Sequence, residues 1–145
     1  MVTPDAQELA SRSAEIMWSK DHASKALGMV IDKVAPGSAQ VSMKVRDDMV
    51  NGWDLCHGGL IASLADSAFA LACNSYGIVT VAAGFDINFL ESGRLGDTLV
   101  AEARQIALRG RSGVYDVTVR NTDTVIAEFR GRSRSLRRPI IQEQR

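Results

Sequence analysis

The chain has 145 residues, with 17 basic and 17 acidic side chains and a formal net charge of zero. This length suits one domain with a full hydrophobic core, and we expect a single domain over residues 1–145 with its core at about 25–136. The neutral balance argues against a nucleic-acid partner, which a broad basic field would favour, and no uninterrupted apolar run reaches the roughly 18 residues of a membrane-spanning helix.

The first half of the chain predicts a helix, two strands and a second helix. Apolar residues spaced three and four apart predict the first helix, and strict alternation predicts the second strand. The second helix is apolar on nearly all sides. In chain order we expect a helix at 4–20, a turn at 21–28, strands at 29–34 and 39–46 on either side of Pro36-Gly37, a loop at 47–57, and a buried helix from Gly58 to about Ser75.

The second half predicts four strands joined by short turns. They are expected at 78–90 (broken by Gly84), 98–108, 114–120 and 125–136, followed by a disordered tail at 137–145. Short connections between consecutive strands favour an antiparallel sheet, and the lone apolar helix must lie against it. The sequence therefore predicts an α+β fold in which one curved sheet wraps one helix.

Asp66 is a single carboxylate in the middle of the apolar helix. A buried ionised carboxylate without a partner costs several kcal/mol or shifts its pKa, so a hydrophobic residue would serve folding better there. The helix opens with His57-Gly58-Gly59, and a helix that begins at two glycines presents bare backbone N–H groups. A carboxylate and an N–H cradle together indicate acyl-transfer chemistry.

The spacing of these groups indicates a site shared between two chains. Gly59 and Asp66 lie two helical turns apart, roughly 10 Å along the axis, whereas reacting groups must approach within about 3 Å. Two antiparallel copies of this helix in a symmetric dimer would bring Asp66 of one subunit to Gly58 and Gly59 of the other. We therefore expect a dimer at least.

Roles follow from this arrangement. The N–H of Gly58, with Gly59 beside it, would polarise a thioester carbonyl with the help of the positive helix end. Asp66 would act as a general base toward water or as a nucleophile that forms a mixed anhydride, and the sequence does not choose between them. Four further side chains would hold the water or the carboxylate, or orient the amide: Ser63, Ser67, Asn51 and His57.

Other interpretations of these residues are open. Asp66 could be a satisfied core residue, and His57 could be only a capping residue. A Cys56 nucleophile is disfavoured because adjacent residues on a turn rarely point the same way, and the histidines and cysteines lack any known metal-ligand spacing, so no metal is expected. Three arginines fit either a solvated face or a phosphate site: Arg109, Arg111 and Arg132.

The motifs Asn51-Gly52, Cys56-His57-Gly58-Gly59 and Ser63 to Ala70 resemble the hotdog-fold acyl-CoA thioesterases, most closely the phenylacetic-acid-degradation branch. The similarity extends over residues 10–136 and includes Gly96-Asp97-Thr98-Leu99. It implies an antiparallel sheet around a central helix and dimers that pair into a homotetramer. It also implies Asp66 as the catalytic carboxylate, the Gly58 N–H as the carbonyl-polarising donor, and Asn51, His57 and Ser67 close by, although relatives often carry Thr at the last position.

The resemblance further implies hydrolysis of aryl- or arylacetyl-CoA thioesters, such as phenylacetyl-CoA and its hydroxylated forms, in phenylacetate catabolism. No cofactor is expected, because CoA is part of the substrate. Gly59, Arg109, Arg111 and Arg132 are the expected substrate-binding residues, the arginines for the CoA phosphates. Two alternatives stay open: a non-catalytic acyl-CoA-binding protein and an acyl-thioester dehydratase. The N-terminus lacks a secretory signal and the two cysteines are too few for a disulfide framework, so we expect a cytoplasmic protein.

Overall fold

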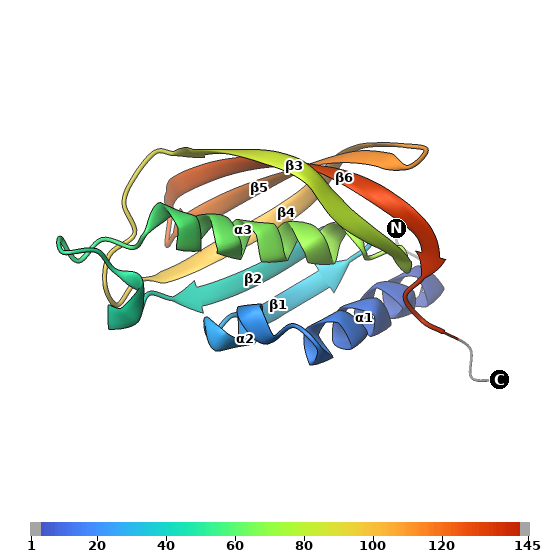
Figure 1. The fold of residues 1–145 in the computed structure, drawn as a ribbon, viewed down its shortest axis with the longest axis horizontal. Helices are drawn as coiled ribbons and strands as arrows, with labels where there is room; N and C mark the ends of the chain where they lie inside the picture. The colour runs from blue at the N-terminus through green and yellow to red at the C-terminus, as the bar shows by residue number, and fades with distance from the viewer. Residues whose placement is uncertain (1–3, 143–145) are drawn as a thin grey trace.

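A computed structural model describes residues 4–142, which form one six-stranded antiparallel sheet curved around one helix (Figure 1). The expected α+β layout is confirmed. The elements are α1 (Pro4–Ser19), α2 (His22–Ala26), β1 (Val30–Ala35), β2 (Ser38–Lys44), a 3₁₀ turn (Asp47–Met49), α3 (Gly58–Cys73), β3 (Ile78–Phe89), β4 (Thr98–Arg109), β5 (Ser112–Asn121) and β6 (Thr124–Pro139). The strand order is β1-β2-β4-β5-β6-β3, which puts β1 and β3 at the two edges.

Helix α3 lies lengthwise in the hollow of the sheet and supplies the centre of the core (Figure 1). Phe69 is its largest buried side chain, and its ring centre lies 5.7 Å from those of Tyr115 on β5 and Phe129 on β6. A Cβ at Gly131 of β6 would come within 2.7 Å of the Phe69 ring. The small residue on the strand therefore makes room for the aromatic residue on the helix.

The N-terminal helix α1 contacts β1, and the short helix α2 contacts α1 and α3 (Figure 1). The amphipathic helix expected at 4–20 is confirmed as α1. The turn expected at 21–28 instead contains the short helix α2, because the Asp21 side chain accepts a hydrogen bond from the Ser24 N–H at 2.9 Å and so caps its first turn. Within residues 4–142, no helix is both long and apolar enough to cross a bilayer.

Two expectations for the strands need correction. Gly84 does not break β3, which continues through a register shift between Ala82 and Gly84. The tail expected from residue 137 begins later, because β6 runs to Pro139, which pairs with Ile78, and the Ile140 N–H bonds the Gly77 carbonyl at 2.9 Å. Residues 143–145 of the expected tail lie outside the described residues.

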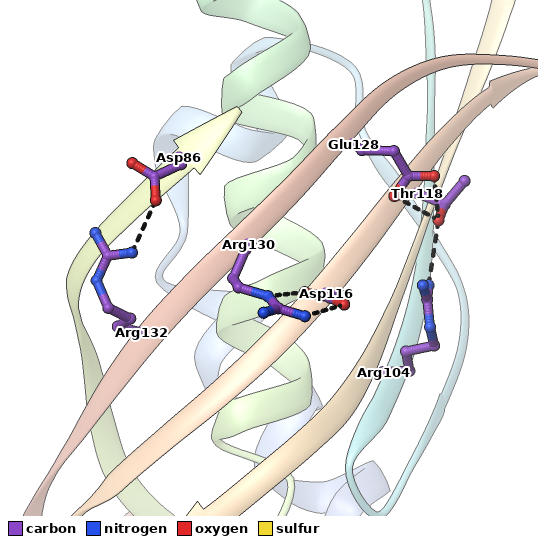
Figure 2. A network of polar contacts seen from close by, with 7 residues as sticks. All are labelled: Asp86, Arg104, Asp116, Thr118, Glu128, Arg130 and Arg132. Atoms are coloured by element: carbon purple, nitrogen blue, oxygen red, sulfur yellow. Dashed lines mark hydrogen bonds and ion pairs between the residues drawn. The ribbon is translucent and has the colours of Figure 1, made fainter. Parts of the chain in front are cut away.

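The outer face of the sheet carries charged pairs that link neighbouring strands (Figure 2). Arg130 of β6 binds Asp116 of β5 at 2.7 Å, and Arg132 binds Asp86 of β3 at 3.0 Å. Arg130, Arg132 and Arg134 alternate along β6 and lie on its outer face, while Phe129 on the same strand points inward and is buried. Both pairs are partly exposed, so each contributes little to stability on its own.

Candidate active site

The N-terminus of α3 presents two free backbone donors. His57 is its N-cap, and its carbonyl accepts the N–H groups of Leu60 at 3.0 Å and Ile61 at 3.2 Å. No side chain caps this end, and among residues 4–142 the N–H groups of Gly58 and Gly59 have no hydrogen-bond partner. The positive end of the helix dipole and these two N–H donors can together bind a carbonyl oxygen.

Asn51 shapes the loop that leads into this helix. Its Oδ1 accepts the backbone N–H groups of Trp53 at 2.9 Å and Leu55 at 3.2 Å, and its own N–H bonds the Leu55 carbonyl. The His57 N–H bonds the Met49 carbonyl at 3.0 Å, while the His57 side chain is exposed. Asn51 and His57 therefore lie at the entrance of α3, and Asn51 fixes the backbone there.

The two glycines differ in their surroundings. A Cβ at Gly58 would come within 2.9 Å of the Phe89 ring at the end of β3, whereas a Cβ at Gly59 would meet nothing within 4 Å. Gly58 is thus required for close approach of an aromatic side chain, and Gly59 leaves an open surface next to it. No local pattern predicts this contact, because Phe89 is 31 residues away in the sequence.

This difference predicts that alanine affects stability differently at the two positions. In Gly59→Ala we expect a gain of about 0.5–1 kcal/mol in the free energy of unfolding, the usual preference of a helix for alanine. Gly58→Ala should lose that gain because the Phe89 ring must move. Denaturant unfolding measures both, and Phe89→Leu should restore the gain in the Gly58→Ala background. Equal stabilities of the two alanine variants would contradict the contact.

Asp66 lies on the face of α3 that the chain covers least. This face is partly exposed along residues one turn apart, at Gly59, Ala62, Ser63, Asp66 and Ala70. Burial raises the pKa of the Asp66 carboxyl above its ordinary 3.8, and the nearby negative charge of Asp21 raises it further. Among residues 4–142, the Asp66 carboxylate has neither a hydrogen bond nor an ion pair, so its oxygens are available.

The two serines beside Asp66 are already engaged. The Ser63 hydroxyl donates to the Gly59 carbonyl at 2.9 Å. The Ser67 hydroxyl lies 2.7 Å from that of Ser24 on α2, a residue that the sequence analysis did not single out. Asp21 and Ser24 carried one local signal, an acid followed three residues later by serine at a helix start, but nothing in the sequence placed that turn against α3.

The described chain does not bring Gly58 and Asp66 together. They lie eight residues apart on one helix, which is about 12 Å along its axis, too far for one reacting centre. A reacting centre that uses both groups would therefore need a second copy of α3 to supply one of them, and such an intersubunit site stays a prediction.

If Asp66 acts as a base, kcat/KM must depend on its ionisation. Since its pKa is raised, kcat/KM should fall as the pH drops through a value above 3.8, and should level off at higher pH. A pH profile of kcat/KM with a substrate that does not titrate in this range measures the acidic limb. A limb at or below 3.8 would contradict a desolvated carboxylate as the base.

The three arginines expected to bind phosphates do not form one cluster. Arg109 and Arg132 line one cavity of about 400 Å³ together with Ala83 of the edge strand β3. Arg111 lines a separate cavity of about 140 Å³ and donates to the Ser135 carbonyl at 3.2 Å. Arg132 is also held by Asp86. Arg109 is the one of the three that is exposed without an ion pair or side-chain hydrogen bond among the described residues.

The cysteines are buried and unpaired with each other. Burial raises the pKa of both thiols, that of Cys73 to about 12, so neither is poised to form a thiolate. Within residues 4–142 no group of three or more His, Cys, Asp or Glu side chains is placed to hold a metal ion.

Comparison with known proteins gives consistent matches over nearly the whole chain. The family described as the thioesterase superfamily matches residues 54–128. The acyl-coenzyme A thioesterase PaaI of Escherichia coli is 43% identical over 136 residues, which cover 92% of this chain and 96% of that protein. The solved structure of the E. coli PaaI protein from the phenylacetic acid degradation operon has a TM-score of 0.90 and 41% identity, and covers 92% of this chain and 98% of that one.

A further solved structure contains a ligand. The protein smu.793 of Streptococcus mutans, solved bound to acetyl CoA, has a TM-score of 0.73 at 29% identity, and the match covers 77% of this chain and 90% of that one. The resemblance to the hotdog-fold acyl-CoA thioesterases and to their phenylacetic-acid-degradation branch is therefore confirmed.

Proposed function

This chain belongs to the thioesterase superfamily, and we propose that it is an acyl-CoA thioesterase that hydrolyses aryl- and arylacetyl-CoA esters, such as phenylacetyl-CoA and its hydroxylated forms, to the free acid and CoA. The observation that carries this proposal is that, among residues 4–142, the Asp66 carboxylate has no hydrogen bond or ion pair and the Gly58 and Gly59 N–H groups on the same helix have no acceptor. The chain is also 43% identical to an acyl-coenzyme A thioesterase. The substrate class comes from the relatives from phenylacetate degradation.

The site residues support a hydrolysis with Asp66 as general base. The thioester oxygen would accept the Gly58 N–H, which stabilises the negative charge that develops on it. Asp66 would take a proton from water as the water oxygen attacks the carbonyl carbon. The C–S bond then breaks, and the CoA thiolate leaves and takes up a proton. The raised pKa of Asp66 and its lack of donors favour the base role over the nucleophile role, because both increase its affinity for a proton.

We further propose that Asp66 and Gly58 of each site come from two chains. Two features of the structure support a partner chain at β3 and α3. Strand β3 is an edge of the sheet and exposes Val81, Phe85 and Phe89 by 41–50%, and such apolar edges invite pairing. The least covered face of α3, which carries Asp66, is otherwise made of small residues. A pairing of dimers into a tetramer stays a prediction.

Arg109 and Arg132 are our proposed contacts for the CoA phosphates, because they share a cavity that borders the β3 edge. Arg109→Gln should raise KM for phenylacetyl-CoA about tenfold, as loss of one charge-assisted hydrogen bond does. KM for the N-acetylcysteamine thioester, which has no phosphate, should not change. Arg120→Gln, an exposed arginine outside the cavity, is the matched control. An equal rise for both thioesters would contradict phosphate binding by Arg109.

A thiol-release assay tests the function. Phenylacetyl-CoA, hydroxyphenylacetyl-CoA and a series of fatty acyl-CoA esters should be compared at equal concentration, and we expect the highest kcat/KM for the aromatic esters. Binding of these esters without thiol release would indicate a non-catalytic acyl-CoA-binding protein. Hydration of an enoyl thioester without thiol release would indicate a dehydratase, and either result would overturn the proposal.

The proposed chemistry uses water, a carboxylate and backbone amides, so it requires no cofactor, and CoA enters as part of the substrate. We place the protein in the cytoplasm, where CoA esters arise in aromatic catabolism. The two buried cysteines, which do not pair with each other, agree with a reducing compartment.

A further inference from the structure

A line of three hydrogen-bonded side chains connects α2 to the residue next to Asp66. The Asp21 carboxylate accepts the Ser24 N–H at 2.9 Å through Oδ1 and the Ser24 hydroxyl at 2.8 Å through Oδ2. The Ser24 Oγ in turn lies 2.7 Å from the Ser67 Oγ. Ser24, in the middle of this line between α2 and α3, is 4% exposed, while Asp21 and Ser67 are half-buried.

The direction of the hydrogen bonds along this line is fixed by its acidic end. A hydroxyl has one proton to donate and two lone pairs to accept with. Since an ionised Asp21 can only accept, the Ser24 proton goes to Asp21, and Ser24 must accept the Ser67 proton. The Ser67 hydroxyl therefore turns its lone pairs, and not its proton, to its remaining surroundings.

We propose that Asp21 and Ser24 are positioning residues for catalysis: they hold Ser67 as a hydrogen-bond acceptor for the attacking water and keep its proton away from Asp66. This inference rests on the proposed function. It adds a second helix, α2 of the same chain as Asp66, to the active site. The water would donate one proton to Asp66, which removes it, and the other to Ser67, which orients it. Neither Ser67 nor Ser63 then lowers the basicity of Asp66 by donating to it.

The charges around Asp66 agree with this role. The inward-facing residues of β2, β4 and β6 that pack on α3, such as Met43, Ala101 and Phe129, are uncharged. Tyr115 of β5 and Cys73 of α3 are held neutral by raised pKa values. The charged or titratable side chains of α2 and β1 are exposed, at His22, Lys25, Asp32 and Lys33. Asp21 is the neighbouring charge that acts on Asp66.

The substitution Asp21→Asn should reverse the direction of the hydrogen bonds along this line, with little change in the shape of the side chain. Asparagine caps helices as well as aspartate does, and its oxygen must face the Ser24 N–H. Its amide NH₂ then donates to the Ser24 hydroxyl, which donates to Ser67, and the Ser67 proton turns outward. Asp66 gains a donor and loses a like charge, and both changes lower its pKa.

The test measures kcat, KM and pH profiles of four variants: Asp21→Asn, Ser24→Ala, Ser67→Ala and Ser24→Ala/Ser67→Ala. In Asp21→Asn we expect kcat to fall about tenfold, because a misoriented nucleophile costs one to two orders of magnitude, with KM unchanged and the acidic limb of kcat/KM moved to lower pH. Asp123→Asn, an exposed acid in the turn between β5 and β6, should leave both unchanged.

The double variant separates positioning from structure. If Ser24 acts only through Ser67, Ser24→Ala lowers kcat in the wild-type background and has no effect on kcat in the Ser67→Ala background. An equal loss in both backgrounds would overturn the inference, as would an acidic limb that does not move in Asp21→Asn. In either case a wild type that hydrolyses phenylacetyl-CoA leaves the proposed function intact, whereas an inactive wild type counts against the function itself.

Discussion

Asp66→Asn should lower kcat by roughly 10²–10⁴-fold, the contribution of a positioned general base, while KM changes little. The amide has nearly the shape of the carboxylate but cannot take the proton from water. Thiol release from phenylacetyl-CoA measures the loss, and CoA binding by calorimetry should be retained. Asp32→Asn, on an exposed position of β1, is a matched control that should keep full activity.

The same variant should not lose stability. The raised pKa of Asp66 means that the folded state binds its proton more tightly than the unfolded state does. The carboxylate therefore destabilises the fold increasingly as the pH rises from the unfolded pKa through the folded one. Replacing it with a neutral amide removes that cost, so the melting temperature of Asp66→Asn at pH 7 should equal or exceed that of the wild type. A large drop, or unchanged turnover, would assign Asp66 a structural role.

Mixing two inactive variants should restore activity. Gly58→Pro removes the N–H donor at the first position of α3, where proline is compatible with a helix, and Asp66→Ala removes the base. In a mixed dimer one site combines the two defects, and the other has an intact Asp66 from one chain and an intact Gly58 N–H from its partner. Random pairing gives mixed dimers half of the time, so an equal mixture should recover about a quarter of wild-type activity.

Two controls make the mixing experiment specific. Each variant alone must be inactive over the same range of concentrations, and Gly58→Ala, which adds the same contact with Phe89 but keeps the N–H, should retain more activity than Gly58→Pro. Co-expression with two affinity tags isolates the mixed dimers directly, and these should have about half of wild-type activity. No recovery in the isolated mixed dimers would contradict a site shared between chains.

Local patterns in the sequence predicted most of the fold. Alternation identified the inner and outer faces of β2, and the apolar stretch after Gly58 identified α3 within two residues at its end. The short helix α2 was missed because its stability comes from one cap, at Asp21, and not from hydrophobic periodicity. The end of β6 was placed too early because its last residues, exposed and basic, are ordered by pairing with Ile78.

The candidate site was predictable only where its residues are neighbours in the sequence. Asp66 was conspicuous because a charge in an apolar helix needs a reason, and His57-Gly58-Gly59 because two glycines open a helix. The contact of Gly58 with Phe89, and the hydrogen bond between Ser67 and Ser24, join residues 31 and 43 positions apart. The separation of Arg111 from Arg109 depends on the face of the sheet to which each side chain points, which the hairpin sequence does not reveal.

Activity as a function of dilution tests most directly whether the site requires two chains. Molecular mass should be followed by mass photometry or sedimentation while phenylacetyl-CoA hydrolysis is measured in the same samples, down to concentrations at which the assembly dissociates. We predict that activity per chain falls in proportion to the fraction of chains in dimers or larger assemblies. A monomer that hydrolyses the thioester at the full rate would contradict the pairing of Asp66 with a partner's Gly58.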